Sequence, residues 1–245
     1  MGSSLETLIL DNKEPLIELQ EKINYKFKDI TLLQTALIHS SFAFERLRNK
    51  EHNETLEFLG DAVLDLAVGH ILFKKFPEMR EGKLTRIRSA LVNEAGLANM
   101  ARQLDLGTYI LLGKGEESSN GREKPSILSC AYEALVGAFY LDGGYDRALA
   151  FIRQSFGPLL ESERDILLSI DAKSALQERL QETYNEGPTY VLDKEEGPAH
   201  ARIFTVSVFF RETVLGTGIA PSKKEAEQRA AKTALENLPE LLDVS

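Results

Sequence analysis

The amino-acid sequence predicts an all-α domain followed by a small α+β domain whose elements follow the order α-β-β-β-α. Three observations support this fold class. Apolar residues recur at helical spacing through the first two-thirds of the 245 residues, no strand pattern precedes residue 180, and alternating apolar residues follow it. We therefore predict a helical domain over residues 1–168 and a mixed domain over residues 169–245.

Helix-breaking and capping residues divide the first domain into helices. Helical periodicity begins at Leu16 and continues to Leu37. Further helices are predicted over residues 53–75, 84–104, 126–141 and 145–156. Ser126 is the expected N-cap of the third of these. The residues expected to end them are, in order, Pro77, Gly107, the pair Gly143-Gly144 and Pro158.

The second domain begins with a helix and continues with three strands. Asp171 is the expected cap of a helix over residues 172–184. Strands are predicted at residues 190–192, 202–210 and 214–219, and a last helix starts at Ser222. In the middle strand, apolar side chains alternate onto one face: Phe204, Val206, Val208 and Phe210.

The net charge of −9 argues, taken alone, against a partner as acidic as nucleic acid. The stretch from Asp171 carries 9 Lys and Arg against 13 Asp and Glu, and the remainder carries 20 against 25. Neither part is basic. Any nucleic-acid surface must therefore depend on a few well-placed cations.

The composition predicts a cytoplasmic protein. No apolar run approaches the roughly 20 residues that a membrane span needs. The segment from Met1 to Glu14 contains acidic residues and no cleavage site of the secretory type. The single cysteine, Cys130, excludes an internal disulfide.

Three carboxylates lie at helical spacing in the first long helix. Glu54, Glu57 and Asp61 stand at positions i, i+3 and i+7, which places them on one face. Such a group is often only a solvated acidic stripe. Here apolar neighbours, among them Phe58 and Val63, surround the acids, which argues against a polar surface helix.

A further carboxylate, Glu133, lies in a segment that is apolar nearly all round, residues 130–141. A buried carboxylate needs a cation, a hydrogen bond or a metal ion. An ion pair with Arg or Lys is one explanation. The other is a Mg²⁺ site, because acids from two helices supply the oxygen ligands that this ion prefers. No His/Cys cluster with zinc spacing competes.

The start of the last helix combines a capping box with two lysines. Ser222 and Glu225 form the box, and Lys223 and Lys224 fall in the first turn. Lysine is unfavourable there because the helix N-terminus is already partly positive. A docked phosphate would offset that cost. The alternative is a solvated lysine pair.

These segments resemble bacterial ribonuclease III. The run from Asn53 to Leu64 is similar to the signature of that family and departs from it chiefly at Thr55, where the family usually has Arg. Residues 126–144 resemble its second acidic segment, and residues 76–88 its middle region. The resemblance covers nearly the whole chain.

The resemblance implies a Mg²⁺-dependent endonuclease that cuts double-stranded RNA to 5′-phosphate and 3′-hydroxyl ends, in rRNA and mRNA processing and decay. It also implies a homodimer, and Mn²⁺ as a substitute ion. By resemblance, Mg²⁺ is bound by Glu57, Asp61 and Glu133, of which Asp61 and Glu133 matter most for hydrolysis. The remaining matched positions are Glu54 and Glu81 for substrate placement and Phe58 for the dimer interface.

Cys130 departs from the family pattern, which has Asp three residues before the second catalytic Glu. A thiol is a poor ligand for Mg²⁺, so no metal role is assigned to Cys130. We expect a small buried apolar residue there. Retained activity with altered metal affinity follows as a prediction.

Residues 171–238 resemble a double-stranded-RNA-binding domain, which reads the A-form helix by its shape. The resemblance implies that Gln177 and the loop with His200 enter successive minor grooves, while Lys223 and Lys224 hold phosphates. His200 is equally well explained as an ordinary loop residue. Glu227 stands where such domains often have a third basic residue.

Two other functions are compatible with parts of the sequence. A protein that grips duplex RNA without cutting it would explain Cys130. Hydrolysis of a small phosphate substrate would leave the second domain unexplained. The presence of Glu57, Asp61, Glu81 and Glu133 favours the endonuclease.

Overall fold

A computed structural model describes residues 4–160, 172–198 and 202–242 of the chain. The chain divides into two compact units, Met1–Pro158 and Leu159–Ser245, each of which is described by itself. The predicted boundary between residues 168 and 169 lies outside the described residues and stays a prediction. Within the described part of the chain, no helix is both long and apolar enough to cross a membrane.

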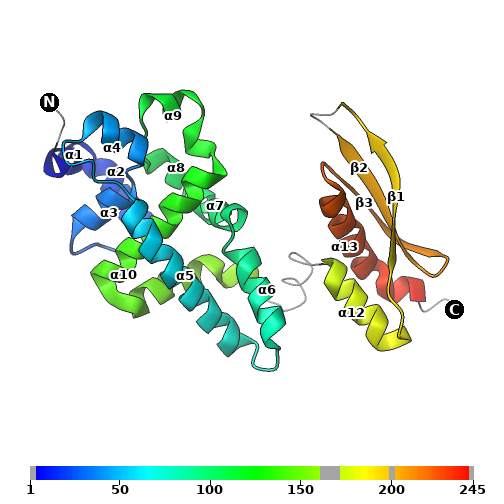
Figure 1. The fold of residues 1–245 in the computed structure, drawn as a ribbon. Coiled ribbons are helices and arrows are strands. Elements are labelled where there is room, and N and C mark those ends of the chain that lie inside the picture. The colour runs from blue at the N-terminus through cyan, green and yellow to red at the C-terminus, as the bar shows by residue number, and fades with distance from the viewer. Residues whose placement is uncertain (1–3, 161–171, 199–201, 243–245) are drawn as a thin grey trace. The chain divides into compact units, whose positions relative to one another are not determined.

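The first unit is helical, as predicted (Figure 1). In its described residues, the only β pairing is an isolated bridge between Ile38 and Leu111. Its elements are α1 (Leu5–Asp11), α2 (Lys13–Lys22), α3 (Ile30–Ala36), α4 (Ser40–Arg46), α5 (Glu54–Lys75), α6 (Glu81–Leu91), α7 (Glu94–Gln103), α8 (Leu106–Tyr109), α9 (Lys114–Ser118), η1 (Gly121–Glu123), α10 (Pro125–Phe156) and η2 (Gly157–Leu160).

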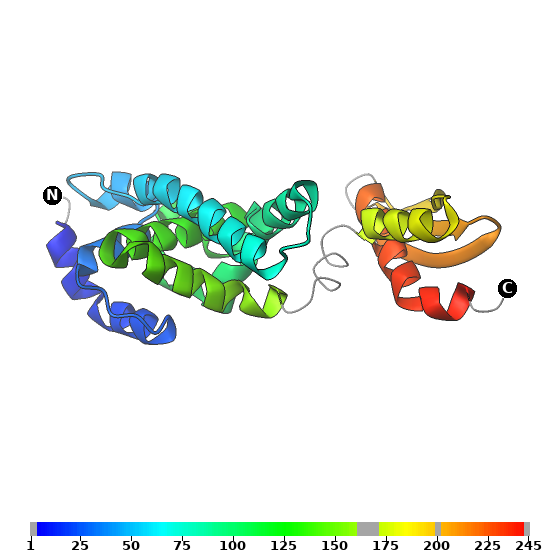
Figure 2. The same ribbon diagram turned by 90° about the horizontal axis from the view of Figure 1, so that it is seen from below.

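Two glycines let the central helices α5 and α10 approach closely (Figures 1 and 2). A Cβ added at Gly60 would overlap the backbone carbonyl of Glu133, and one added at Gly137 would overlap the carbonyl of Leu56. Alanine at either position would therefore force the helices apart.

The prediction of a single helix over residues 84–104 is wrong. Two helices, α6 and α7, occupy this region and meet at Asn93. The Asn93 side chain accepts a hydrogen bond of 2.8 Å from the backbone N–H of Gly96, which caps the second helix. A side chain at Gly96 would overlap the carbonyl of Leu91. The break therefore depends on a local cap that apolar periodicity does not reveal.

Helix α10 begins earlier than predicted. Pro125 is its first residue and Lys124 takes the N-cap position expected for Ser126. Proline suits the first helical position because the N–H that it lacks would have no partner there. The predicted stop at Gly143-Gly144 appears as a kink, since Gly144 has φ 75° and ψ −178°. This left-handed φ favours glycine.

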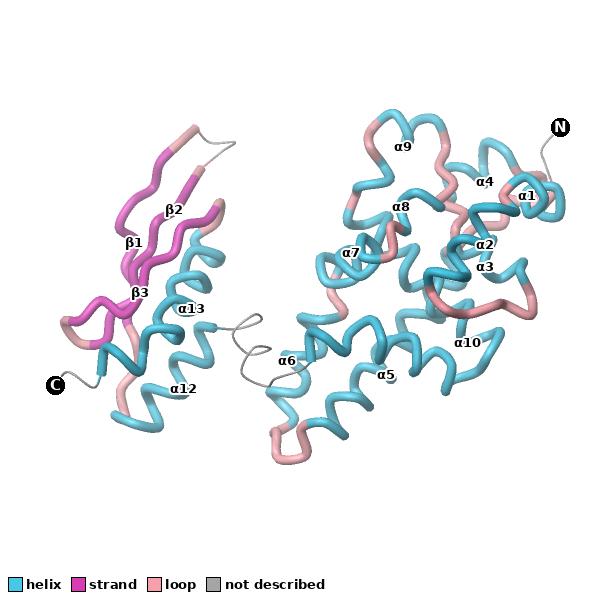
Figure 3. The backbone as a smooth tube through the Cα atoms, turned by 180° about the vertical axis from the view of Figure 1, so that it is seen from behind, coloured by secondary structure: helices cyan, strands magenta, loops and turns pink. Residues whose placement is uncertain are grey.

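The second unit has the predicted α-β-β-β-α order (Figures 1 and 3). Two helices pack on one face of an antiparallel sheet with strand order β1-β2-β3. The elements are α12 (Ala172–Tyr184), β1 (Thr189–Glu196), β2 (Ile203–Phe210), β3 (Thr213–Ala220) and α13 (Lys223–Leu242).

The core of this unit joins α12 and α13 to the inner face of the sheet. Val206, Val208 and Phe210 are buried, as the alternation predicts, whereas Phe204 is half-buried. Strand β1 is longer than predicted because an irregularity between Leu192 and Lys194 shifts the register without ending the pairing. The predicted cap Asp171 lies outside the described residues.

Candidate functional site

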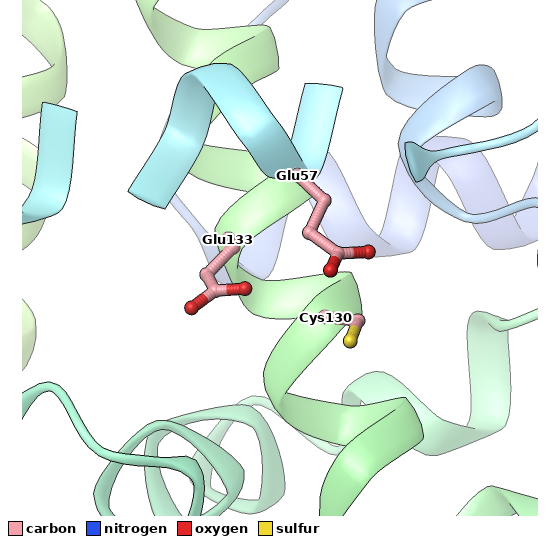
Figure 4. A group of neighbouring side chains, drawn as sticks. All are labelled: Glu57, Cys130 and Glu133. Atoms are coloured by element: carbon pink, nitrogen blue, oxygen red, sulfur yellow. The ribbon is translucent and has the colours of Figure 1, made fainter. Parts of the chain in front are cut away.

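Side chains from α5 and α10 converge at one point in the helical unit (Figure 4). Glu57 belongs to α5, while Cys130 and Glu133 stand one turn apart on α10. One ligand atom from each, a carboxylate oxygen or Sγ, lies within 4.8 Å of the other two. All three side chains are half-buried. We call this group the acidic cluster.

The helix contact explains why residues so distant in sequence meet here. Gly60 lies one turn after Glu57 and contacts the backbone of Glu133. Because the backbones touch, the flanking side chains on the same faces are directed toward a common point. The acidic cluster therefore depends on the α5–α10 packing.

The electrostatics of the acidic cluster favour a cation. Burial, followed by the charges of Asp61 and Glu57, raises the pKa of Glu133 to about 7. Burial, followed by the charge of Glu57, raises the pKa of the Cys130 thiol to about 12. In the metal-free protein, negative charge at these atoms is thus costly, and a bound cation would offset the cost.

The other predicted acidic residues of this unit, Glu54, Asp61 and Glu81, are not members of the acidic cluster. Asp61 lies one turn after Glu57, is exposed and is not within the group of three, although its charge acts on Glu133. Glu54, at the start of α5, lies 3.9 Å from Nδ1 of His52. Glu81, the first residue of α6, accepts a hydrogen bond of 3.0 Å from the Thr85 hydroxyl.

Cys130 is the member of the acidic cluster to which the sequence analysis assigns no metal role. It is half-buried, not fully buried as expected, and its Sγ lies beside both carboxylates. The i, i+3 spacing of Cys130 and Glu133 indicates that the two side chains share one face of a helix. A metal role for Cys130 is excluded in the sequence only by the weak affinity of a thiol for Mg²⁺.

The lysine pair of the second unit lies at the start of α13. The Ser222 hydroxyl accepts a hydrogen bond of 3.2 Å from the N–H of Glu225, as the capping box predicts. Lys223 Nζ lies 3.7 Å from the Glu195 carboxylate and 5.6 Å from the ring centre of Phe204. Lys224 is exposed. Both cations thus reach the surface at a helix N-terminus.

The structure describes only some of the other residues predicted to contact RNA in this unit. Gln177 is exposed on α12, next to Gly187. His200 lies outside the described residues. Glu227, at the position of an expected cation, forms an ion pair of 2.5 Å with Lys173.

Both units match known families and proteins. A family profile described as Ribonuclease-III-like matches residues 29–159, and one described as Double-stranded RNA binding motif matches residues 172–238. A relative named Ribonuclease 3 from Desulfotalea psychrophila is 58% identical over 97% of this chain and 99% of its own length. Another Ribonuclease 3, from Pelotomaculum thermopropionicum, is 47% identical over 92% of this chain and 94% of its own.

Solved structures agree with the helical unit. The nuclease domain of ribonuclease III from Campylobacter jejuni has a TM-score of 0.55 and 45% identity, and the match covers 59% of this chain and 95% of that domain. A second structure of that domain has a TM-score of 0.53 and 46% identity, and the match covers 57% of this chain and 97% of that domain. It is reported for structural flexibility in a region involved in dimer formation.

A helical nuclease unit with an acidic cluster, joined to a double-stranded-RNA-binding motif, defines a double-strand-specific endoribonuclease. The chain belongs to the ribonuclease III family. The resemblance drawn from residues 53–64 is therefore confirmed.

Proposed function

We propose that this endoribonuclease uses Mg²⁺ to cut double-stranded RNA into products with 5′-phosphate and 3′-hydroxyl ends, and that it acts in rRNA and mRNA processing and decay. One observation carries the proposal: the carboxylates of Glu57 and Glu133 converge from two helices. Since rRNA and mRNA precursors of bacteria are cytoplasmic, we place the enzyme in the cytoplasm.

The oxygen donors fit Mg²⁺, which takes one or two protein carboxylates and completes its shell with water and substrate phosphate. Glu57 and Glu133 would hold the ion, with Asp61 as the third acid. Mn²⁺ accepts the same oxygen ligands and would substitute. When bound, the ion lowers the pKa of a water molecule and stabilises charge on the attacked phosphate.

The protein's own groups prepare the site for this chemistry. Glu133, with a pKa of about 7, would lose its proton to solvent on holding a cation, and α10 would keep its carboxylate directed toward Glu57. Asp61 and Glu133 are the proposed catalytic residues. Glu54 and Glu81, at the first turns of α5 and α6, are proposed to help place the RNA strand.

The second unit is proposed to hold the duplex by its shape and its phosphates. Gln177 and His200 would enter minor grooves, and Lys223 and Lys224 would bind phosphates between them. The exposed lysines at the N-terminus of α13 support this assignment, because helix dipole, free N–H groups and ammonium ions all favour an anion.

We also propose a homodimer through α5. Phe58, Leu66 and Phe73 are 81%, 61% and 71% exposed and lie on one face of this helix. Exposed large apolar residues in a row mark an interaction surface. The dimer formation described for the Campylobacter jejuni domain supports the existence of a dimer, and the exposed face of α5 is what supports the choice of interface.

The deciding assay incubates the full chain with long duplex RNA, with and without Mg²⁺. Cutting that needs the ion and yields fragments that RNA ligase can rejoin is the expected result. The Glu133→Gln variant should bind duplex RNA but cut at least roughly 10–100-fold more slowly. Glu14→Gln, a matched change on the exposed face of α2, should cut normally.

RNA that is retarded on a gel but never shortened in Mg²⁺ or Mn²⁺ would overturn the proposed chemistry. Full activity of Glu133→Gln would overturn the assignment of the site.

A further inference from the structure

We infer that Cys130 is a direct ligand in the acidic cluster and that it shifts the preference of the site from Mg²⁺ toward thiophilic divalent ions such as Co²⁺ and Zn²⁺. The inference rests on the proposed metal site for the existence of a bound ion. It goes beyond that proposal because it adds a sulfur donor and a change in ion selectivity.

The distances within the acidic cluster suit one ion held by all three side chains. Zinc–sulfur bonds are about 2.3 Å and zinc–oxygen bonds about 2.0–2.2 Å, so two ligands of one ion are at most roughly 4.5 Å apart. The ligand atoms of Glu57, Cys130 and Glu133 already lie within 4.8 Å of one another. Small side-chain movements therefore complete a three-ligand site.

The position of the sulfur is set by the fold. Cys130 and Glu133 are one turn apart on α10, so their side chains project from the same face. A cysteine side chain has a single torsion angle that moves its sulfur, so Sγ stays near the carboxylates. Figure 4 shows Sγ of Cys130 near the carboxylates of Glu57 and Glu133. An ion bound by both carboxylates would therefore lie within reach of this sulfur.

The donor set determines which ion gains most. Mg²⁺ gains little from a thiol and would use the two carboxylates and water. Co²⁺ and Zn²⁺ bind thiolate, imidazole and carboxylate alike, and the thiolate forms as the thiol proton passes to solvent. A mixed sulfur and oxygen site therefore favours these ions over Mg²⁺ more than an all-carboxylate site does.

The test uses Co²⁺ as the probe, because a cobalt–thiolate bond gives a charge-transfer absorption band in the near ultraviolet. Cys130 is the only cysteine in the chain, so such a band has one source. The full-length protein should show the band on Co²⁺ titration. Cys130→Ser, which is nearly isosteric, and Cys130→Asp should lack it while retaining the circular dichroism spectrum of the parent.

Competition between Zn²⁺ and Mg²⁺ for the Co²⁺-loaded proteins gives the change in selectivity. The ratio of Zn²⁺ to Mg²⁺ affinity should be at least roughly tenfold higher in the parent than in Cys130→Asp, the lower end of effects usual around metal sites. Glu57→Gln should weaken Co²⁺ binding and should raise the Co²⁺ concentration at which the absorption band appears. Both effects are expected because the carboxylate and the thiol share one ion.

Three results would overturn the inference: no Co²⁺ binding, Co²⁺ binding without the band, or equal Zn²⁺ to Mg²⁺ ratios in parent and variants. Duplex-RNA cleavage in Mg²⁺, measured in parallel, separates this inference from the proposed function. Cleavage without the band contradicts only the inference. The band without cleavage in any divalent ion supports the sulfur ligand and contradicts the proposed function.

Discussion

Among the carboxylates of the described residues, Glu133 is the one whose pKa the fold raises most. Burial, Asp61 and Glu57 raise its pKa from an ordinary value of 4.5 to about 7. Between these two values the folded protein holds the proton more tightly than the unfolded chain does. The stability of the metal-free protein therefore falls as pH rises through this window.

Replacing Glu133 with Gln should remove this loss of stability. In metal-free protein, Glu133→Gln should raise the Tm of the helical unit by a few degrees above about pH 7 and change it little below 4.5. Thermal unfolding in the presence of a chelator, followed across pH, measures the effect. Glu14→Gln should show no such dependence. A Tm difference equal at all pH values would contradict the altered ionisation of Glu133.

At the scale of elements, the contact of α5 with α10 determines whether the acidic cluster exists. Gly60→Ala should lower the stability of the helical unit by about 1–3 kcal/mol or more, because the added methyl group meets the backbone carbonyl of Glu133 and not a movable side chain. Cleavage of duplex RNA should fall with it, since Glu57 and Glu133 would separate. Denaturant unfolding and a cleavage assay measure both effects.

Gly82 supplies the matched control for that prediction. It also lies in a helix, α6, but a Cβ added there would meet nothing within 4 Å apart from its chain neighbours and the backbone of its own helix. Gly82→Ala should leave the stability unchanged or raise it by up to about 1 kcal/mol, because alanine restricts the unfolded chain. Equal losses in both variants would point to a general effect of alanine and not to the helix contact.

The first turn of α13 is the element on which duplex binding should depend most. Lys224→Ala should weaken metal-free binding to duplex RNA of any sequence and reduce the slope of log affinity against log salt by about one. Lys232→Ala makes the same charge change two turns further along α13. If both variants lose affinity for duplex RNA equally, the loss is caused by the change in overall charge, and Lys224 does not form a phosphate site at the start of the helix.

At the scale of the whole molecule, the exposed face of α5 predicts self-association. Phe58→Glu should convert a dimer into a monomer and reduce cleavage, because a charge at an apolar interface is not solvated. Sedimentation velocity measures the change. Leu10, on α1, is 73% exposed and supplies a control of the same kind. If Leu10→Glu dissociates the protein equally, α5 is not the interface.

The sequence by itself determined the two-part fold class, the longest helices and the three strands, but not the short helices α1, α4, α8 and α9. Helical periodicity, proline and capping residues are local signals, so the helix predicted at 53–75 differs from α5 by one residue. The order α-β-β-β-α followed from alternation in residues 202–210 and from the capping box at Ser222. Where a local cap competes with periodicity, as at Asn93, apolar spacing alone joined two helices into one.

Only the tertiary structure decided which functional side chains meet. Glu57 and Glu133 could be chosen from their surroundings, but the sequence assigned no metal role to Cys130 and could not place Asp61 outside the group of three. The reason is physical. Helix periodicity determines which residues share a face of one helix. The distance between α5 and α10 depends instead on Gly60 and Gly137, each of which lies against the backbone of the other helix.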